Sequence, residues 1–291
     1  MIVQLWGTRG SLASSGPETA GYGGNTAAVE IVSADGTILA LDAGTGIRRL
    51  GAAIDSSVER IDILLTHLHM DHIQGLGFFA PFFRPSGEIH VWGPASATMG
   101  LRTRLTRYLS PPLFPVRIRD LDARVVLHDA PQEPVKIGAF DVVAQHVIHP
   151  GPTVGYRISA DGATVAYLPD HEPALGARRF PEEPRWTSGF DLASGADLLI
   201  HDGQYSDDER AMRIGWGHSS VSEAVAFGEL AGVRRLILFH HDPSHSDAVL
   251  DELTEGARAR GTSIEVVAGR EGASYDLGTR VHALSTEAAR R

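Results

Sequence analysis

Cysteine is absent from the 291-residue sequence. Its absence excludes disulfide bonds and metal sites built on thiolates, and it fits the cytoplasmic location that we expect. Long hydrophobic runs are absent too. None approaches the ~20 residues of a membrane-spanning helix, and residues 1–7 lack the basic start and apolar core of a secretory signal peptide. We therefore expect no membrane partner.

Basic residues are in the minority, with 26 Lys and Arg against 36 Asp and Glu and a formal net charge of −10. This balance argues against a large nucleic-acid partner, whose phosphates require a basic surface. The segment 84–119 departs from it, because it contains six Arg and one acid, Glu88. Two interpretations are open: a solvated helix face, or a lid over a small anionic substrate, since Arg binds phosphate through paired hydrogen bonds.

Apolar runs with strand or helix spacing fill most of the chain, and 43% of the residues are hydrophobic, which suffices for a large core. We expect strands at 2–6, 25–33, 37–42, 61–65, 88–92, 125–128, 140–148, 154–159, 164–168, 197–200, 234–239 and 264–267, and helices at 47–54, 95–109, 220–232 and 247–260. Strands and hairpins mixed with helices favour sheets with helices on the outside. No low-complexity linker divides the chain. We expect one domain over 1–280 with two similar halves, a Pro-, aromatic- and Arg-rich lid-like insertion at 78–120, and a polar tail at 281–291.

Four ligand-type side chains crowd into six residues directly after the apolar run 61–65: His67, His69, Asp71 and His72. His67 and His69 share one side of an extended segment, because strand side chains alternate, and the other two follow a turn later. Two pairs of imidazole and carboxylate ligands aimed at neighbouring points suit a two-metal site for zinc, manganese or iron. The density of the cluster disfavours the alternative, a polar turn with chance histidines.

Further ligand-type residues stand at other strand ends, namely His149, Asp170, Asp202 and His240. Each alone is more often a hydrogen-bonded polar group or a turn residue than a ligand. Their shared position favours one site, because sites are commonly assembled by loops at the edge of a rigid scaffold.

These residues resemble the ligand pattern of the metallo-β-lactamase fold superfamily, and most closely its phosphodiesterase branch, which includes ribonuclease Z and cyclic-nucleotide phosphodiesterases. The likeness extends from Gly7 to about Pro243. It rests on His67-x-His69-x-Asp71-His72, on His149 six residues before Gly155-Tyr156-Arg157-Ile158, on Val165-Ala166-Tyr167-Leu168-Pro169-Asp170, and on His240 after Leu236-Ile237-Leu238-Phe239. The resemblance implies an α/β fold, an αββα sandwich of two mixed β-sheets with helices on the outer faces. It also implies one metal bound by His67, His69 and His149, a second bound by Asp71, His72 and His240, and Asp170 as the bridge.

Three further segments are similar to this branch. Ala196-Asp197-Leu198-Leu199-Ile200-His201-Asp202 resembles one of its motifs, with Asp202 where Glu more often stands; Gly217-His218-Ser219-Ser220 resembles the segment that carries its catalytic His; and Gly23-Gly24-Asn25-Thr26 resembles a loop near the site. A His just ahead of a helix N-terminus is well placed beside a phosphate, which favours a catalytic role for His218; the alternative is a capping residue or one that supports a metal ligand. The resemblance implies Asp71, His218 and Asp202 as catalytic residues.

Some positions depart from the family pattern. Met70 stands where Trp or Ala is often found. His171 and Glu172 follow Asp170 where Thr is common, so we expect them to crowd the site, while His146 and His241 leave the register of two ligands open. Ribonuclease Z carries a long tRNA-gripping arm between the third His and the bridging Asp, and here only a hairpin fits. We therefore expect that the protein does not process tRNA.

The resemblance implies a metal-dependent hydrolase. Two divalent metal ions, with Zn²⁺ expected first and Mn²⁺ or Fe²⁺ as alternatives, would activate a bridging water as the attacking hydroxide. His218 would stabilise the developing charge or protonate the leaving oxygen, and Asp71 would assist as a base while it binds the metal. We expect a small phosphodiester such as a cyclic nucleotide as the substrate. The alternatives are hydrolysis of a carboxylic ester, lactone or thioester, di-iron redox chemistry, and a non-catalytic binding protein. A homodimer is also open, because relatives are often dimers.

Overall fold

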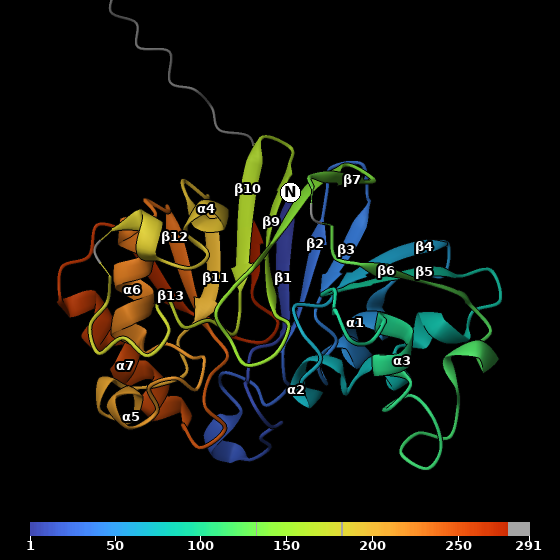
Figure 1. The fold of residues 1–291 in the computed structure, drawn as a ribbon, viewed down its shortest axis with the longest axis horizontal. Helices are drawn as coiled ribbons and strands as arrows, with labels where there is room; N and C mark the ends of the chain where they lie inside the picture. Colours follow the sequence, from blue (N-terminus) through green and yellow to red (C-terminus); the bar gives the residue numbers. More distant parts are fainter. Residues whose placement is uncertain (132, 182, 279–291) are drawn as a thin grey trace, which may run out of the picture.

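Two seven-stranded β-sheets pack against each other in the computed structural model, which describes residues 1–131, 133–181 and 183–278 (Figure 1). The strand order is β14-β1-β2-β3-β4-β5-β6 in the first sheet and β13-β12-β11-β10-β9-β8-β7 in the second. The first sheet contains β1 (Ile2–Gly7), β2 (Ala28–Val32), β3 (Ile38–Leu41), β4 (Arg60–Leu64), β5 (Glu88–Gly93), β6 (Arg124–Asp129) and β14 (Ser274–Asp276). The second contains β7 (Val135–Ile137), β8 (Phe140–His146), β9 (Val154–Ala160), β10 (Ala163–Leu168), β11 (Leu198–Asp202), β12 (Arg235–Phe239) and β13 (Glu265–Ala268).

Both sheets are mixed. In the first sheet β1, β2 and β3 are antiparallel neighbours, whereas β3 to β6 are parallel. In the second, β7 to β10 are antiparallel and β10 to β13 are parallel. Parallel neighbours end at the same edge of a sheet, and ligand sites commonly form outside these carboxyl ends. The expected polar residues at the carboxyl ends of β4, β10, β11 and β12 are therefore carried to such edges.

The main core lies between the two sheets. Alternate residues of the strands fill it, including Val3 and Leu5 of β1, Ile158 of β9 and Val165 of β10. β11 is buried along its whole length, because the other sheet covers one face and helices cover the other. This explains why its sequence is a continuous apolar run rather than an alternating one.

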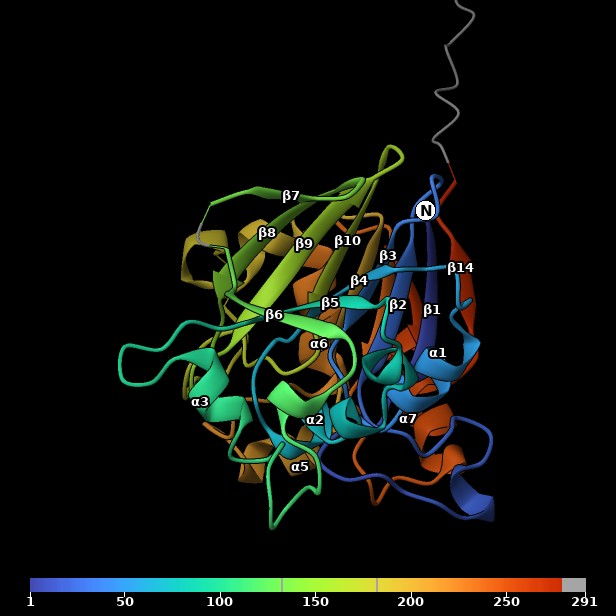
Figure 2. The same cartoon turned by 90° about the vertical axis from the view of Figure 1, so that its right-hand side faces the viewer.

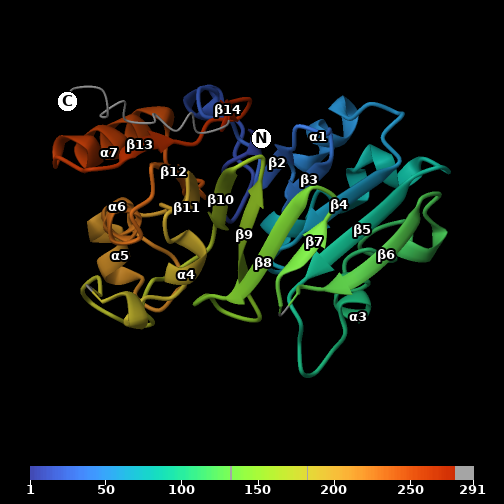
Figure 3. The same cartoon turned by 90° about the horizontal axis from the view of Figure 1, so that it is seen from above.

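Helices cover the outer face of each sheet (Figure 2, Figure 3). The elements on the first sheet are α1 (Ile47–Ala53), α2 (Met70–Ile73) and α3 (Leu101–Leu105), which share a second core with β4 and β5. Those on the second sheet are α4 (Phe190–Ala193), α6 (Val221–Leu230) and α7 (Asp247–Ala259), while α5 (Asp207–Met212) precedes α6. Helix α6 begins at the predicted capping box of Ser220 and Glu223.

The αββα sandwich of two mixed sheets is confirmed, but some elements differ from the prediction. The expected helix at 95–109 is wrong in extent, because only α3 is helical there, and it begins after Gly100, which is extended (ψ 155°). Glycine disfavours a helix interior by about 1 kcal/mol relative to Ala. The tail 281–291 lies outside the described residues, and the domain boundaries stay predictions. In the described part of the chain, every helix is too short or too polar to cross a membrane.

Candidate metal centre

The seven predicted ligands come together at the edge where the two sheets meet. They form two adjoining groups in which the potential ligand atoms lie within 4.8 Å of one another. The first group consists of His67, His69 and His149, and the second of Asp71, His72, Asp170 and His240. All are buried except His69. A site of this composition contains only imidazole and carboxylate, the donors that zinc, manganese and iron accept.

The first sheet supplies four of these side chains through one short segment. The chain leaves β4 at Leu64, bends at Thr66 and continues to His69, the N-cap of α2, which is extended (φ −66°, ψ 153°). Asp71 and His72 lie in α2 itself. The change from strand to helix turns the later pair toward a different point from the earlier pair. The expected division of the cluster into two pairs follows from this turn.

Asp170 lies between the two groups. Its Oδ1 atom is 2.9 Å from His72 Nε2 and 3.3 Å from His240 Nε2. Its Oδ2 atom is 3.6 Å from His149 Nε2 and 3.7 Å from His67 Nε2. One carboxylate therefore presents a separate oxygen to each group, an arrangement suited to a bridging ligand.

Hydrogen bonds on the outer ring nitrogens fix how three of the imidazoles face the centre. The Nδ1–H groups of His72, His149 and His240 donate to Asp42 Oδ2 (2.8 Å), Gly217 O (2.8 Å) and Gln204 Oε1 (3.1 Å). In the neutral rings Nε2 then carries a lone pair that faces inward. The Nε2 atoms of His72 and His240 are only 3.3 Å apart. Two lone pairs at this distance require a cation or a proton between them.

The donor set fits divalent metal ions. His67 Nε2 and Asp170 Oδ1 are buried and have no hydrogen-bond partner, and such unpaired buried groups are unfavourable unless something binds them. The local field also favours a cation. Burial lowers the pKa of His240, but the Asp170 and Asp71 carboxylates outweigh burial and raise it to about 9. Burial opposes ionisation of Asp170, yet the surrounding imidazoles hold its pKa well below the usual range.

Asp42 was missed by sequence reasoning. It is fully buried, and its carboxylate accepts hydrogen bonds from Thr66 N (2.7 Å), Thr66 Oγ1 (2.9 Å), His72 Nδ1 (2.8 Å) and Tyr167 Oη (2.9 Å). Its φ of 54° is unusual for a residue other than Gly, and such outliers cluster at functional sites. A signal was present, because Asp42 closes the expected strand 37–42 as the predicted ligands close theirs.

His218 and Asp202 lie beside the second group. The Nδ1–H of His218 donates to Asp202 Oδ2 at 2.7 Å. The fully buried Asp202 also accepts from the backbone N–H groups of His171 and Gln204. The His218 ring stacks on the ring of His240, with centroids 5.0 Å apart. The structure thus brings both predicted catalytic residues to the centre. The roles of all the site residues, Asp71 included, stay predictions.

The neighbouring ligand-type residues point elsewhere. His171 Nδ1–H donates to His201 Nε2 (2.8 Å), His241 Nε2–H donates to Gly269 O (2.9 Å), and His146 contacts Thr153 O. Glu172 binds Arg210 at 2.8 Å. The expectation that His171 and Glu172 crowd the site is therefore wrong, since the chain turns both side chains away from it.

The Gly-rich loop before β2 packs closely against the centre. A Cβ on Gly10 would overlap the His240 ring, and Ser11 N–H donates to Asp71 Oδ2 (2.7 Å). In the segment 23–26, which resembles a family loop, Asn25 binds Glu271, and Thr26 Oγ1 accepts from Thr45 N (2.9 Å). This segment supports the scaffold and adds no side chain to the ligand groups.

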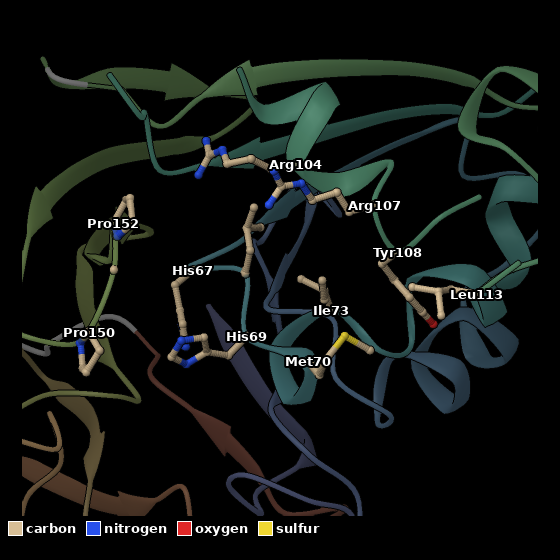
Figure 4. Close-up of a pocket in the computed structure, with 12 residues that line it drawn as sticks. His67, His69, Met70, Ile73, Arg104, Arg107, Tyr108, Leu113, Pro150 and Pro152 are labelled. Carbon is tan, nitrogen blue, oxygen red and sulfur yellow. The ribbon is translucent and has the colours of Figure 1, made fainter. Parts of the chain in front are cut away.

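A cavity of about 340 Å³ opens beside His67 and His69 (Figure 4). Its wall combines the metal centre with α3, the following turn and the loop before β9. The lining residues are His67, Leu68, His69, Met70, Ile73, Arg104, Arg107, Tyr108, Leu113, Pro150, Gly151 and Pro152. Two of the six Arg in 84–119 therefore face this cavity, and no carboxylate is among its lining residues. Another, Arg84, instead binds the backbone carbonyls of Ile54 and Asp55.

Comparison with known proteins identifies the family. A model described as a beta-lactamase superfamily domain matches residues 37–241. The solved metallo-beta-lactamase fold protein YhfI from Bacillus subtilis has a TM-score of 0.68 at 21% identity, covering 94% of this chain and 98% of that one. Curated relatives named ribonuclease Z are 26–29% identical to the chain. One of them, from Haloarcula marismortui, is 26% identical over 296 residues, 89% of this chain and 91% of the relative.

These relatives overturn one expectation. The sequence led us to exclude ribonuclease Z activity and a large nucleic-acid partner, and to expect a small phosphodiester as the substrate instead. This exclusion is wrong. Besides the curated relatives, human tRNase Z, short form, has a TM-score of 0.65 at 21% identity and covers 95% of this chain and 99% of its own. The exclusion relied on the short gap between His149 and Asp170, which the β9–β10 hairpin does fill. That length describes one segment only, and the likeness to these relatives extends over most of the chain.

The architecture, the ligand-type residues at the strand ends and the matched family model agree with one another. The chain belongs to the beta-lactamase superfamily, has the metallo-beta-lactamase fold and is a metal-dependent hydrolase.

Proposed function

We propose that the protein is a phosphodiesterase that cleaves RNA, the activity for which its curated relatives are named. The observation that carries this proposal is the position of Asp170, with one carboxylate oxygen toward His72 and His240 and the other toward His67 and His149. A bridged pair of cations suits in-line displacement at phosphorus, because it stabilises both the attacking and the leaving oxygen.

The proposed ligand roles follow the two groups. His67, His69 and His149 would hold one ion, Asp71, His72 and His240 the other, and Asp170 both; zinc is the ion to test first, since it commonly takes imidazole and carboxylate donors. When bound, the ions would supply positive charge at the phosphate and a water of lowered pKa.

The chain's own residues supply the proton transfers. Asp202 accepts the Nδ1–H of His218 and so fixes the ring, which leaves Nε2 as the atom that passes a proton to the leaving oxygen. Nearby imidazoles outweigh the burial of Asp71 and hold its pKa far below the usual range, so that it stays anionic and can orient the attacking water through its Oδ atoms.

Arg104 and Arg107 support RNA as the substrate. They line the cavity beside His67 and His69, and no carboxylate is among its lining residues. Arg104 also donates to the backbone carbonyl of Pro94 and lies near Asp129. Arg suits phosphate because its planar guanidinium donates two parallel hydrogen bonds. The net charge of −10 does not prevent this contact, since the Debye length is about 8 Å at physiological salt and the local charge then dominates.

The test uses zinc-loaded protein and four substrates: a labelled precursor tRNA, an unstructured RNA, bis(p-nitrophenyl) phosphate and p-nitrophenyl acetate. We expect cleavage of the RNA and of the phosphodiester, and loss of both zinc and activity in His69→Ala. The matched control is His146→Ala, because His146 is an exposed residue at the end of β8 outside the ligand groups. Turnover of the acetate ester without turnover of any phosphodiester would contradict the proposal.

A further inference from the structure

Glu172 is a fully buried carboxylate that the proposed reaction does not use. Its Oε1 accepts hydrogen bonds from Gly176 N (3.1 Å), Gly215 N (3.2 Å) and Arg210 Nη2 (2.8 Å), and its Oε2 accepts one from Gly217 N (3.0 Å). A buried charge is unfavourable unless it is paired and hydrogen-bonded throughout. These four donors satisfy it, and two of them belong to the turn that leads into His218.

The turn has a conformation that only glycine adopts readily. Gly215 and Gly217 have φ of 84° and 86°, in the left-handed region. Gly217 also lies against the loop before β9, where a Cβ would overlap Pro150 and approach His149 Nδ1 to 2.6 Å. Such a turn needs external hydrogen bonds to hold it, and the Glu172 carboxylate supplies them to both glycine N–H groups.

Gly217 connects Glu172 to two residues of the centre. Its carbonyl accepts the Nδ1–H of His149 at 2.8 Å, and the Nε2 of that ring lies 3.2 Å from His69 Nδ1. The next residue along the chain is His218, whose ring Asp202 holds. The backbone N–H of Glu172 itself donates to Ile148 O (3.0 Å), directly before His149. Glu172 therefore binds the backbone on both sides of the His149 ring.

We propose that Glu172 is a positioning residue, which sets the orientation of His149 and His218 through the backbone of Gly217. The inference rests on the proposed roles of these two His residues. The competing explanation is that Glu172 serves only as the counter-ion of Arg210. The two explanations separate cleanly, because Arg210 has a second carboxylate partner, Glu223, at 2.9 Å from its Nε.

The experiment compares Glu172→Gln with the matched control Glu223→Gln. Gln at 172 directs its NH₂ group at donors that need an acceptor, whereas Gln at 223 preserves the capping box with Ser220. Zinc affinity is measured by chelator competition, the absorption spectrum is recorded after cobalt substitution, and kcat and KM are measured on bis(p-nitrophenyl) phosphate.

For Glu172→Gln we expect a 10–100-fold weaker zinc affinity, as is typical when a partner of a ligating imidazole is lost. We also expect a changed cobalt spectrum, and a kcat about tenfold lower at unchanged KM, because a displaced acid–base group loses only part of the roughly 10²–10⁴-fold that such a group contributes. Glu223→Gln should change none of these readouts. Wild-type zinc affinity in Glu172→Gln, or an equal loss in Glu223→Gln, would overturn the proposal.

Should Glu172→Gln fail to fold, Glu172→Asp gives the same two outcomes. Its shorter side chain keeps a charge beside Arg210 but draws back from Gly217. Zinc affinity is read without substrate, so the two proposals fail separately. A wild-type protein that binds zinc but cleaves no phosphodiester refutes the proposed function and leaves the positioning role intact.

Discussion

Asp42 offers a sharp perturbation of the centre, because it touches the predicted ligand His72 without being a predicted ligand itself. In Asp42→Asn the side chain keeps one acceptor oxygen but turns an NH₂ group toward buried donors. Four donor groups, on Thr66, His72 and Tyr167, hydrogen-bond to Asp42. A hydrogen bond to a charged group contributes about 1.5–3 kcal/mol. Because Asn keeps some of these hydrogen bonds, we expect the free energy of unfolding of the metal-free protein to fall by about 3 kcal/mol.

The same change should weaken zinc binding by roughly 10–100-fold, because His72 loses the acceptor that fixes its tautomer. The assays are urea unfolding of the metal-free protein and chelator competition for zinc. The control is Asp62→Asn on the neighbouring strand. Asp62 is also buried and accepts hydrogen bonds from Arg60 and Trp92, but it does not touch the ligands. Wild-type zinc affinity in Asp42→Asn, or an equal loss of affinity in Asp62→Asn, would refute the reasoning.

Three further outcomes are expected. Arg107→Ala should raise KM for RNA about tenfold and reduce its salt dependence, as expected for one lost phosphate contact, whereas Arg102→Ala, from the same segment but outside the cavity, should change neither quantity. Burial lowers the pKa of His201 to about 4. Because His201 in the unfolded chain titrates near 6.5, its contribution to the free energy of unfolding is complete above about pH 6.5 and falls by about 3 kcal/mol as the pH drops toward 4. Urea unfolding of His201→Asn should therefore show a smaller decrease in the free energy of unfolding over this pH range. Gly10→Ala should reduce zinc content measured by metal analysis, because the added Cβ would overlap the His240 ring, and unchanged zinc content would contradict this.

Sequence patterns predicted the fold and most of the centre because both depend on local regularities. Apolar runs mark strands, and a ligand directly after a strand is carried to the sheet edge whatever the loops do. The cluster from His67 to His72 needed no tertiary information, since its spacing alone divides it into two pairs. The helix expected at 95–109 was not predicted correctly. The apolar spacing there favours a helix, but Gly100 is extended and the helix begins only after it.

The partners that a side chain contacts across distant segments were not predictable, even where its place at a strand end, as for Asp42, could be read from the sequence. Asp42 contacts His72 and Tyr167 only because β3, β4 and β10 meet at the same edge. The direction of the side chains after Asp170 could not be predicted either. Glu172 has a carboxylate that could bind a metal ion, but it points toward Arg210. The exclusion of tRNA failed for a related reason, since the length of one hairpin carries no information about contacts that other surfaces make.

The position of Asp170 has a consequence for how the molecule opens. His67, His69, Asp71 and His72 follow β4 of one sheet, whereas His149, Asp170 and His240 lie beside β9, β10 and β12 of the other. Metal ions bound by both sets of residues would cross-link the two sheets of the sandwich. Separation of the two sheets and release of the ions would then be a single event, so that removal of the metal ions would lower the stability of the whole fold. At a free ion concentration 100 times the dissociation constant, this linkage is worth about 2.7 kcal/mol.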